Sequence, residues 1–364
     1  MMHLPMTAPP CDGLPEALKV KEPTRGPKPL EAPTATTANI KKKAHAQQGA
    51  ALLAALLTVA LVTTLAAGAV WQQWRGIEVE SAERHRAQAR WLLLGSLDWA
   101  RVILREDALS DGAQTPTDHL AEPWAVPLQE ARLSSFLSAL PEGGSADSEE
   151  VALSEQVFLS GQIVDVQSRM PLLGLVQGDR VAPAVVLKFE RLFEALGLPP
   201  EQLRILTQGL LRAQGQQGAV LPQRMSQLGW LGVSPQTVAR ISPYVHLLPS
   251  GTPVNVNTAS AMVLYASVPG LSLSDAQRLV QERSRSHWPT LEAFEKATGR
   301  STALGSSHSV NTRHFEVMGT LRTPSTTISE RSLLQRDGRE LKVLWREAGQ
   351  WALAPALPVA ASLQ

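Results

Sequence analysis

Residues 50–71, with the sequence AALLAALLTVALVTTLAAGAVW, decide the fold because they hold no charged side chain and are almost wholly apolar. A helix of about 20 such residues spans the hydrocarbon core of a bilayer, which is roughly 30 Å thick. Lys41, Lys42 and Lys43 lie shortly before this stretch, and positively charged flanks favour the cytoplasmic side. We therefore expect one membrane span, with a cytoplasmic N-terminus and the bulk of the chain on the far side.

Two other interpretations of this stretch stay open. A cleaved secretory signal also combines basic residues, an apolar run and small residues at its cleavage site, here residues 66–69. Against this, the helical pattern continues through residues 78–107. A buried core helix is the other interpretation, and three lysines beside so long an apolar run disfavour it.

The start of the chain differs in composition from the rest. Residues 1–49 are rich in proline and lack apolar periodicity, which predicts a disordered leader. The only cysteine, Cys11, falls in this leader, so the remainder is expected to fold without disulfides. The chain has 34 Lys and Arg against 33 Asp and Glu, and a net charge of +1 gives no electrostatic reason to expect nucleic acid as a partner.

Beyond the span the helical period persists. Leu93, Leu97, Ala100 and Leu104 form one stripe of a helix that we expect to be continuous over residues 50–107. Alternating patterns then predict antiparallel strands. Residues 150–159 and 161–167 are expected to pair across a tight turn at Ser160-Gly161, and the closing strands are expected at residues 313–322, 326–335 and 341–346, with a hairpin turn at Asp337-Gly338.

Short helices punctuated by Gly, Pro and Ser are predicted between these strands. Gly197, Gly232 and Gly270 each join two apolar helical stretches at similar intervals, which indicates an internal repeat. Ser234 and Ser274 are predicted N-caps of the second helices. The expected parts of the chain are a leader (1–49), a membrane span (50–74), the first part of an α+β domain (75–185), an inserted helical domain (186–302), closing strands (303–350) and a flexible tail (351–364).

The junction of Gly49 and Ala50 has the features that a prepilin peptidase recognises: a small residue, basic residues before it and an uninterrupted apolar helix after it. The alternative is that Gly49 merely begins a membrane helix. Pilin-like subunits carry Glu at the fifth position after the cut, where this chain has Ala54. In lipid that carboxylate pairs with the N-terminal amine of a neighbouring subunit. Ala54 therefore either removes the chain from that class or places it at the end of a filament.

A second motif surrounds the turn at residues 268–272, VPGLS, which is preceded by residues 254–259, VNVNTA. The pattern is similar to a helix-hairpin-helix, whose backbone amides can contact a DNA phosphate. The alternative is a packing motif in which glycine lets two helices approach. Few cations surround the turn, and DNA binding requires several, so a membrane-anchored DNA-uptake protein is the second hypothesis rather than the first.

Signals for catalysis and for metal binding are weak. The chain lacks a G-x-S-x-G, a P-loop and a dinucleotide fingerprint. His308 and His314 form the closest histidine pair outside the leader, at a spacing that no common metal motif uses. Four carboxylates lie at helical spacings that suit solvated faces: Asp275, Glu282, Glu292 and Glu295. We therefore expect no enzyme activity, no metal site and no cofactor.

Several segments together resemble one known family, general secretion pathway protein K of bacterial type II secretion systems. The order and spacing of these segments carry the resemblance, and they are Gly49 with ALLAALLTVAL, residues 99–107 (WARVILRED), 118–125 (DHLAEPWA), 161–169 (GQIVDVQSR), 254–259 (VNVNTA) and 343–346 (VLWR).

The resemblance implies an α+β fold in which a pilin-like, long N-terminal transmembrane helix packs on an antiparallel sheet, with a large inserted all-α domain that contains helix-hairpin-helix-like repeats. It implies cleavage by prepilin peptidase after Gly49, methylation of Ala50, and a minor pseudopilin in the bacterial inner membrane with its bulk in the periplasm. The implied partners are the I and J minor pseudopilins, with the H type and the major pseudopilin as further candidates. Members of the family typically lack the Glu at the fifth position after the cut, and this chain has Ala54 there. The side chains expected to pack on neighbouring subunits are Leu52, Leu53, Leu56, Leu57, Leu93, Leu97 and Leu104.

The chain departs from the family in three places. The family often binds calcium through an acidic loop, but residues 211–218 (LRAQGQQG) hold no carboxylate here, and calcium prefers several charged oxygen ligands. We therefore do not expect calcium. Residues 170–174 replace an Asn-rich run with MPLLG, and the leader is unusually long, so that Met1, Met2 and Met6 leave the start codon open.

Overall fold

The computed structural model describes residues 45–110, 116–138, 156–215, 220–299, 304–324 and 326–349. The chain divides after Trp74 into two compact units, which are described separately. Lys41, Lys42 and Lys43 of the predicted leader, Cys11 and the predicted tail at residues 351–364 lie outside the described residues.

Helix α1, His45–Ser110, is assigned as one helix of 66 residues and confirms the continuous helix expected over residues 50–107. Alanine and leucine dominate its first part, and both favour helix strongly. The hydroxyls of Thr58, Thr63 and Thr64 donate to backbone carbonyls three or four residues earlier at 2.8–2.9 Å. These bonds satisfy the polar atoms of the apolar segment within the helix itself.

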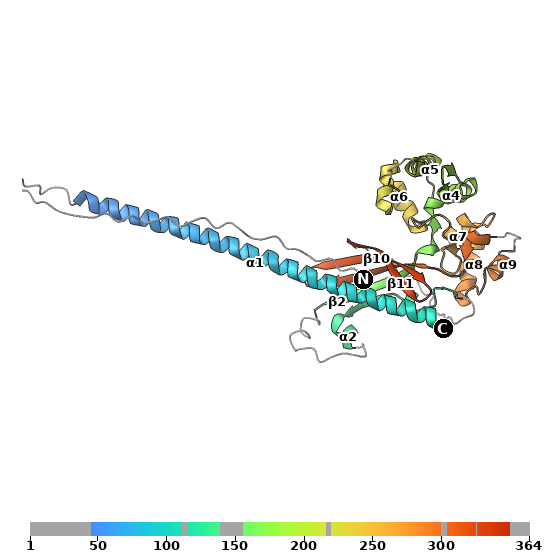
Figure 1. Ribbon diagram of the computed structural model, residues 1–364, viewed down its shortest axis with the longest axis horizontal. Helices are drawn as coiled ribbons and strands as arrows, with labels where there is room; N and C mark the ends of the chain where they lie inside the picture. The colour runs from blue at the N-terminus through green and yellow to red at the C-terminus, as the bar shows by residue number, and fades with distance from the viewer. Residues whose placement is uncertain are drawn as a thin grey trace, which may run out of the picture. The chain divides into compact units, whose positions relative to one another are not determined.

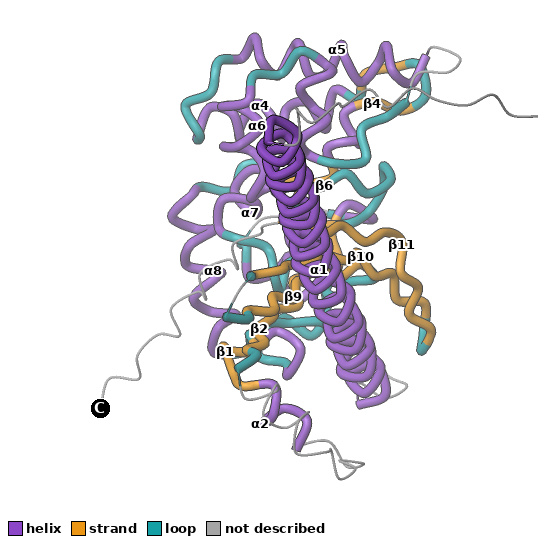
Figure 2. The backbone as a smooth tube through the Cα atoms, turned by 90° about the vertical axis from the view of Figure 1, so that its left-hand side faces the viewer, coloured by secondary structure: helices purple, strands orange, loops and turns teal. Residues whose placement is uncertain are grey.

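The second unit contains a five-stranded sheet in the order β1-β2-β9-β10-β11, with every neighbouring pair antiparallel. Figure 2 shows these strands side by side. The five strands are β1 Leu128–Arg132, β2 Phe158–Asp165, β9 His314–Arg322, β10 Thr327–Asp337 and β11 Glu340–Gly349. The last three lie at the three places where closing strands were expected.

The predicted turn at Ser160-Gly161 is wrong. Strand β2 runs straight through both residues, and Gly161 pairs with Gly319 of β9. A Cβ atom at Gly161 would lie 2.9 Å from the carbonyl oxygen of Met318, so this glycine permits a close cross-strand approach rather than a turn. Residues 150–155 of the other expected strand lie outside the described residues, and the partner of β2 on its outer side is β1, which the sequence did not indicate.

The last part of α1 covers one face of this sheet, as Figure 1 shows. Leu97 and Leu104 are buried against Phe315 and Val317, which alternate along β9 with residues that face the other side of the sheet. Leu93 packs with Leu321 in a neighbouring cluster. The stripe predicted from the sequence is therefore present, but its role is corrected. Leu93, Leu97 and Leu104 are at most 3% exposed within this chain's own core, so their side chains are not available to neighbouring subunits.

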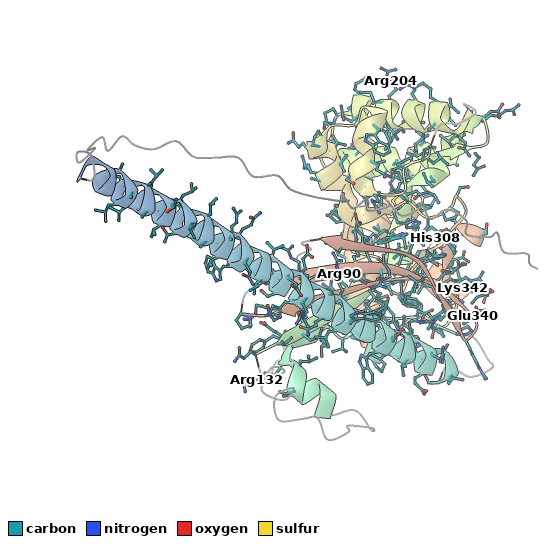
Figure 3. All side chains as sticks on the ribbon, turned by 60° about the vertical axis from the view of Figure 1, so that its left-hand side comes forward. Arg90, Arg132, Arg204, His308, Glu340 and Lys342 are labelled. Atoms are coloured by element: carbon teal, nitrogen blue, oxygen red, sulfur yellow. The ribbon has the colours of Figure 1, made fainter. Side chains whose placement is uncertain are left out.

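The opposite face of the sheet carries a smaller apolar cluster and a chain of ion pairs. Val166, Leu248 and Leu333 are buried there. Glu316 of β9 pairs with Arg169 at 3.4 Å and with Arg331 of β10 at 3.1 Å. Glu347 of β11 in turn pairs with Arg331 at 3.1 Å and with Arg224 at 3.4 Å. These contacts join the sheet to the segments before and within the helical part. Edge strand β11 exposes Glu340 and Lys342, labelled in Figure 3, and such charges disfavour pairing with another strand.

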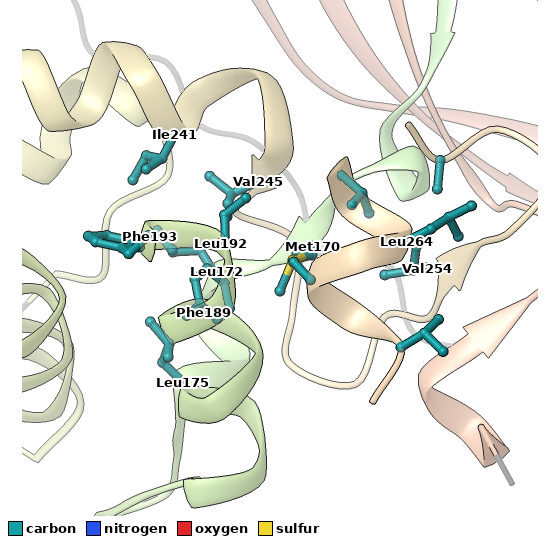
Figure 4. Packing of buried hydrophobic residues seen from close by; sticks show 14 of the residues in the cluster. Met170, Leu172, Leu175, Phe189, Leu192, Phe193, Ile241, Val245, Val254 and Leu264 are labelled. Atoms are coloured by element: carbon teal, nitrogen blue, oxygen red, sulfur yellow. The ribbon is translucent and has the colours of Figure 1, made fainter. Parts of the chain in front are cut away.

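In the described part of the chain between the strands β2 and β9 there are six α-helices. Figure 1 shows α4, α5 and α6 grouped together and α7, α8 and α9 forming a second group. The bounds are α4 Pro183–Ala195, α5 Pro200–Gly215, α6 Pro235–Ile241, α7 Ala261–Ser267, α8 Leu273–Arg285 and α9 Leu291–Ala297. One apolar cluster runs through both groups, and Figure 4 shows Met170 between Leu172 and Phe189 on one side and Leu264 and Val254 on the other.

Shorter elements complete the described chain. They are the helix α2 Leu133–Ser138, the 3-10 helices η1 Pro123–Ala125, η2 Val166–Ser168, η3 Leu172–Leu175, η4 Met225–Leu231, η5 Ser242–Tyr244 and η6 Gly305–Ser307, and the two-residue strands β3 Met170–Pro171, β4 Val176–Gln177, β5 Arg180–Val181, β6 Val245–His246, β7 Val254–Asn255 and β8 His308–Ser309.

The glycines of the predicted repeat each follow a helical element with positive φ, which glycine adopts most easily. The three units differ, because the element before Gly232 is the 3-10 helix η4, and they are not established as helix-hairpin-helix repeats. Ser234 caps α6, as predicted. The cap of α8 is Ser272, not Ser274, because the Ser272 hydroxyl accepts the Asp275 amide at 3.1 Å and starts the helix two residues earlier.

Candidate functional site

The predicted anchor is the first part of α1. Leu52, Leu53, Leu56 and Leu57 are each 59–72% exposed in the first unit. Among the described residues, one helix is long and apolar enough to cross a membrane, with a window of mean hydropathy 2.3 that is 0% buried. Apolar side chains exposed to this extent along a helix suit lipid or another apolar helix.

The predicted processing junction lies inside this helix. Gly49 and Ala50 fall in the first turns of α1, which begins at His45, so the helix starts earlier than a junction at Gly49 suggests. Ala54 is exposed on the same helix. Cleavage between Gly49 and Ala50 stays a prediction, as does the packing of the four exposed leucines on neighbours.

The second unit contains a site that the sequence did not identify as one. We call it the buried joint and define it by seven side chains that meet where the helical part joins the sheet: Asp107, Asp118, Asp165, Asn255, Thr258, Thr312 and Arg336. All seven are at most 7% exposed. They come from the end of α1, the segment before η1, the end of β2, the segment 254–260, the segment before β9, and β10.

Hydrogen bonds connect these segments directly. The Asn255 amide nitrogen donates to the carboxylate of Asp165 at 2.9 Å and to the backbone carbonyl of Asp118 at 3.0 Å. The Thr258 hydroxyl donates to the same Asp165 carboxylate at 2.5 Å. The backbone amide of Thr312 donates to the carboxylate of Asp118 at 2.7 Å. Buried polar atoms are costly unless paired, so these bonds fix how the segments meet.

Arg336 supplies positive charge to the joint. Its guanidinium donates to Asp107 at 2.9 Å and also to the carboxylate of Asp118. Asp107, Asp118 and Glu122 bring carboxylate oxygens within 4.8 Å of one another, close enough to share a cation. The guanidinium of Arg336 already contacts two of them, and we assign no metal to this cluster.

One guanidinium does not balance the carboxylates gathered here. Burial, and then the nearby charge of Asp107, raise the pKa of Glu122 to about 8, although a hydrogen bond from the Trp124 indole opposes the shift. Burial raises the pKa of Asp165 to about 6 despite the hydrogen bond from Thr258. Glu122 is therefore predominantly protonated at neutral pH, which reduces the negative charge that the joint buries.

The turn of the α7–α8 hairpin is held from within the protein. The Arg191 guanidinium of α4 donates to the carbonyl of Val268 at 2.8 Å and to that of Leu271, and it lies 4.5 Å from the ring centroid of Tyr265. Val268 and Leu271 flank the glycine that resembled a DNA-contacting turn. The structure shows a packed hairpin whose carbonyls are bound by the chain's own arginine.

His308 and His314, the histidines considered as metal ligands, make other contacts. The Nε2 atom of His308 lies 3.0 Å from the Ser267 hydroxyl, and burial lowers the pKa of His308 to about 3. His308 lies inside the second unit, as Figure 3 shows. The Nδ1 atom of His314 lies 3.1 Å from the side-chain oxygen of Gln167. Asp275 belongs to the α8 cap and Glu295 accepts the Leu304 amide at 2.6 Å.

Four segments quoted above for their order and spacing converge on the joint. Asp107 comes from residues 99–107, Asp118 from residues 118–125, Asp165 from residues 161–169, and Asn255 and Thr258 from residues 254–259. Thr312 and Arg336 had no signal in the sequence. Arg336 stands near the end of a strand beside a predicted hairpin turn, where an arginine is ordinarily a surface residue.

The architecture defines a class of protein: one long helix that is apolar and exposed in its first part and buried against an antiparallel sheet in its last part, joined to a helical region. A model of the family described as Type II secretion system (T2SS), protein K, matches residues 254–312, which include Asn255, Thr258 and Thr312. Type II secretion system protein K from Pseudomonas aeruginosa is 32% identical over 339 residues, covering 84% of this chain and 94% of that protein. This chain belongs to the Type II secretion system protein K family.

Other comparisons agree. Type II secretion system protein K from Klebsiella pneumoniae is 28% identical over 339 residues, covering 85% of this chain and 99% of that protein. A chain in the crystal structure of the GspK-GspI-GspJ complex from the type 2 secretion system of enterotoxigenic Escherichia coli is similar with a TM-score of 0.54. The two chains are 18% identical, and the match covers 74% of this chain and 99% of that chain. This likeness shows the fold.

Proposed function

We propose that this protein is a minor pseudopilin of a type II secretion system, which caps the tip of a periplasmic pseudopilus and helps to initiate its assembly. The observation that carries the proposal is the double use of α1. Its first part exposes leucines that suit lipid or a neighbouring apolar helix, and its last part is fixed in the protein's own sheet. Membership of the protein K family supports the same function.

The capping position follows from Ala54. This residue is exposed on α1 and offers no carboxylate to the N-terminal amine of a neighbouring subunit. A buried amine without a partner is costly in lipid. A subunit that lacks the carboxylate is tolerated where no neighbour requires it, which is at the end of the filament.

We propose that the I-type and J-type minor pseudopilins are the partners. A solved relative by fold comes from a GspK-GspI-GspJ complex, which supports this choice. The H type, the major pseudopilin and prepilin peptidase are further proposed partners. Leu52, Leu53, Leu56 and Leu57 would pack on neighbours inside the membrane. In the second unit, Trp91 and Val102 of α1 are 72% and 47% exposed and lie near one line of the helix, so they replace the buried stripe as the proposed contact surface outside the membrane.

We further propose that the leader is cytoplasmic, that prepilin peptidase cuts after Gly49 and that Ala50 is then methylated. The helical region is proposed to be an insertion spanning residues 186–302 of a pilin-like domain at residues 75–185 and 303–350. The sheet supports this division, because β1 and β2 precede the helices α4 to α9 while β9, β10 and β11 follow them.

Co-purification tests the proposal. The tagged full chain is produced in bacterial membranes with I-type and J-type pseudopilins, and the recovered partners are quantified. We expect the wild-type chain to recover both partners and Trp91→Ala to recover less of them. Trp230→Ala is the matched control, because Trp230 is 71% exposed but lies on η4 rather than on α1.

If the wild-type chain recovered neither partner, the result would contradict the proposal that this protein is a minor pseudopilin with I-type and J-type partners. Equal losses for Trp91→Ala and Trp230→Ala would contradict the proposed contact surface only. DNA binding is not proposed, because the Gly-bearing turn is bound by Arg191.

A further inference from the structure

Two histidines from distant parts of the chain stack at the edge of the buried joint. His119 lies in the segment that follows α1, and His287 lies in the turn between α8 and α9. Their ring centroids are 3.9 Å apart, and the ring planes differ by 15°. This contact joins the helical part to the segment that leads from α1 into the sheet.

The hydrogen bonds of His119 indicate which of its nitrogens carries the proton. The Nδ1 atom accepts the backbone amide of Ala121 at 3.3 Å. A neutral imidazole has one N–H, so we assign it to Nε2, which lies 3.4 Å from a carboxyl oxygen of Glu122. The other carboxyl oxygen of Glu122 accepts the indole N–H of Trp124.

His287 is held in place through the backbone of the next residue, Trp288, which is hydrogen-bonded to Asn257. The side chain of Asn257 accepts the backbone amide of Trp288 at 2.8 Å and donates to the backbone carbonyl of Trp288 at 3.0 Å. These paired bonds attach the α8–α9 turn to the segment that carries Asn255 and Thr258. The His287 ring is therefore attached, through Trp288 and Asn257, to a segment of the buried joint.

Each element around His119 contributes a charged or titratable group. Helix α1 contributes Asp107, the segment before η1 contributes Asp118 and Glu122, and the α8–α9 turn contributes His287. Strand β10 contributes Arg336, which pairs with Asp107 and Asp118, and the end of β2 contributes Asp165, which faces Asp118.

We propose that the His119–His287 stack is a proton-operated latch, which holds the helical part against the segment after α1 while both rings are neutral and releases it when both are protonated. Two imidazolium rings at this separation repel each other. Glu122 does not offset that repulsion, since it is itself protonated in the acidic range. Arg336 is already paired with Asp107 and Asp118 and adds positive charge to the same region.

The shift in the pKa of His119 also favours release of the stack on acidification. Burial, and then the positive charge of His287, lower the pKa of His119. A histidine whose folded-state pKa is lowered binds its proton more readily once its site opens, so acidification favours the open form. The latch would respond to acidification of the compartment that holds the second unit.

Hydrogen exchange in the full-length protein tests this proposal. The amides of Asp118 and Thr312 donate between the segment after α1 and the segment before β9, within the buried joint, and report its opening. Exchange is measured at about pH 7 and about pH 5, the range in which histidine changes charge. Rates are expressed as protection factors, which removes the intrinsic dependence of exchange on pH. We expect protection at these amides to fall as the pH drops below the ordinary histidine pKa of about 6.5, by at most about tenfold for each pH unit and each proton taken up on opening.

Two variants separate the latch from general acid instability. His287→Phe keeps an aromatic ring for stacking and cannot be protonated, and His287→Asn serves if the phenylalanine variant does not fold. We expect either variant to keep its protection at about pH 5. His85→Asn is the matched control, because His85 is exposed on α1, and it should behave as the wild type does.

Either of two results would overturn the proposal. One is protection at the two amides that does not change between the two pH values in the wild type. The other is an equal loss of protection in the wild type and in the His287 variant, which would attribute the acid response to other groups.

Discussion

The guanidinium of Arg336 lies 2.9 Å from the carboxylate of Asp107, and this buried pair connects strand β10 to the last turn of α1. The same guanidinium contacts Asp118, which is hydrogen-bonded to Asn255 and Thr312 at the two ends of the family-matched region. Arg336 therefore connects β10 to two carboxylates, those of Asp107 and Asp118, that lie more than 200 positions earlier in the chain. The joint determines how the last turn of α1, the sheet and the helical part are held together within the second unit.

Replacing Arg336 should be strongly destabilising. Arg336→Met leaves the buried carboxylates of Asp107 and Asp118 without their cation, which typically costs about 3–5 kcal/mol in the free energy of unfolding. Arg313→Met is the control, because Arg313 pairs with Asp337 on the surface, where such a pair contributes about 0–1 kcal/mol. Denaturant unfolding of both variants measures the difference. Similar small losses would show that the joint does not need its guanidinium.

Glu122 should make the protein less stable as pH rises. Its pKa is raised from 4.5 to about 8, so the folded state holds the proton more tightly and stability falls as pH rises through this window. His246 and His308, with pKa values lowered to about 3, act in the opposite sense, but only below the ordinary histidine range. The effect of Glu122 is therefore isolated between about pH 6.5 and pH 8.

Glu122→Gln tests this dependence. The variant keeps an acceptor for the Trp124 indole and cannot ionise, so its melting temperature should be nearly constant between about pH 6.5 and pH 8 while that of the wild type falls. Parallel slopes for the two proteins would argue against a protonated Glu122.

Gly319 should be required for the approach of α1 to the sheet. A Cβ atom at this position would lie 3.2 Å from Leu93 Cδ2 and 3.2 Å from Ser96 Oγ. Gly319→Val should therefore destabilise the protein by about 1–3 kcal/mol through overpacking. Gly95→Ala is the control, since nothing lies within 4 Å of its Cβ position, and alanine should stabilise the exposed helix by up to about 1 kcal/mol. Thermal unfolding of the two variants should shift in opposite directions.

The buried and exposed leucines of α1 should behave differently. Leu104 is 0% exposed, and Leu104→Ala should cost about 2–5 kcal/mol through the cavity it leaves. Leu109 is 42% exposed on the same helix, and Leu109→Ala should change stability by at most about 0.5 kcal/mol. Denaturant midpoints give the comparison. Equal losses at both positions would mean that α1 is not packed on the sheet as described.

Local sequence patterns predicted the elements whose signals are periodic. The charge-free run and the stripe at Leu97 and Leu104 predicted α1, and alternation predicted the three closing strands. The prediction failed at Ser160-Gly161, where glycine serves a cross-strand contact with Met318 rather than a turn. Local composition does not distinguish these two uses of glycine, because the second depends on a strand more than 150 residues away.

The partner of the helical stripe and the buried joint were beyond the reach of local patterns. An apolar stripe shows that a helix face is buried, but the same pattern suits a neighbouring subunit and the chain's own sheet. The joint is built from single polar residues on segments far apart in sequence, and Arg336 has no periodic signal at all. Several residues of the joint come from the segments that carry the family resemblance. This indicates that the residue types of those segments are needed to connect the parts of the fold.

The most direct test of the account is the mature N-terminus, measured by intact mass on the full-length protein produced with a prepilin peptidase. A pseudopilin that is processed as proposed begins at a methylated Ala50. An intact leader, or a cut near Ala69, would contradict the account.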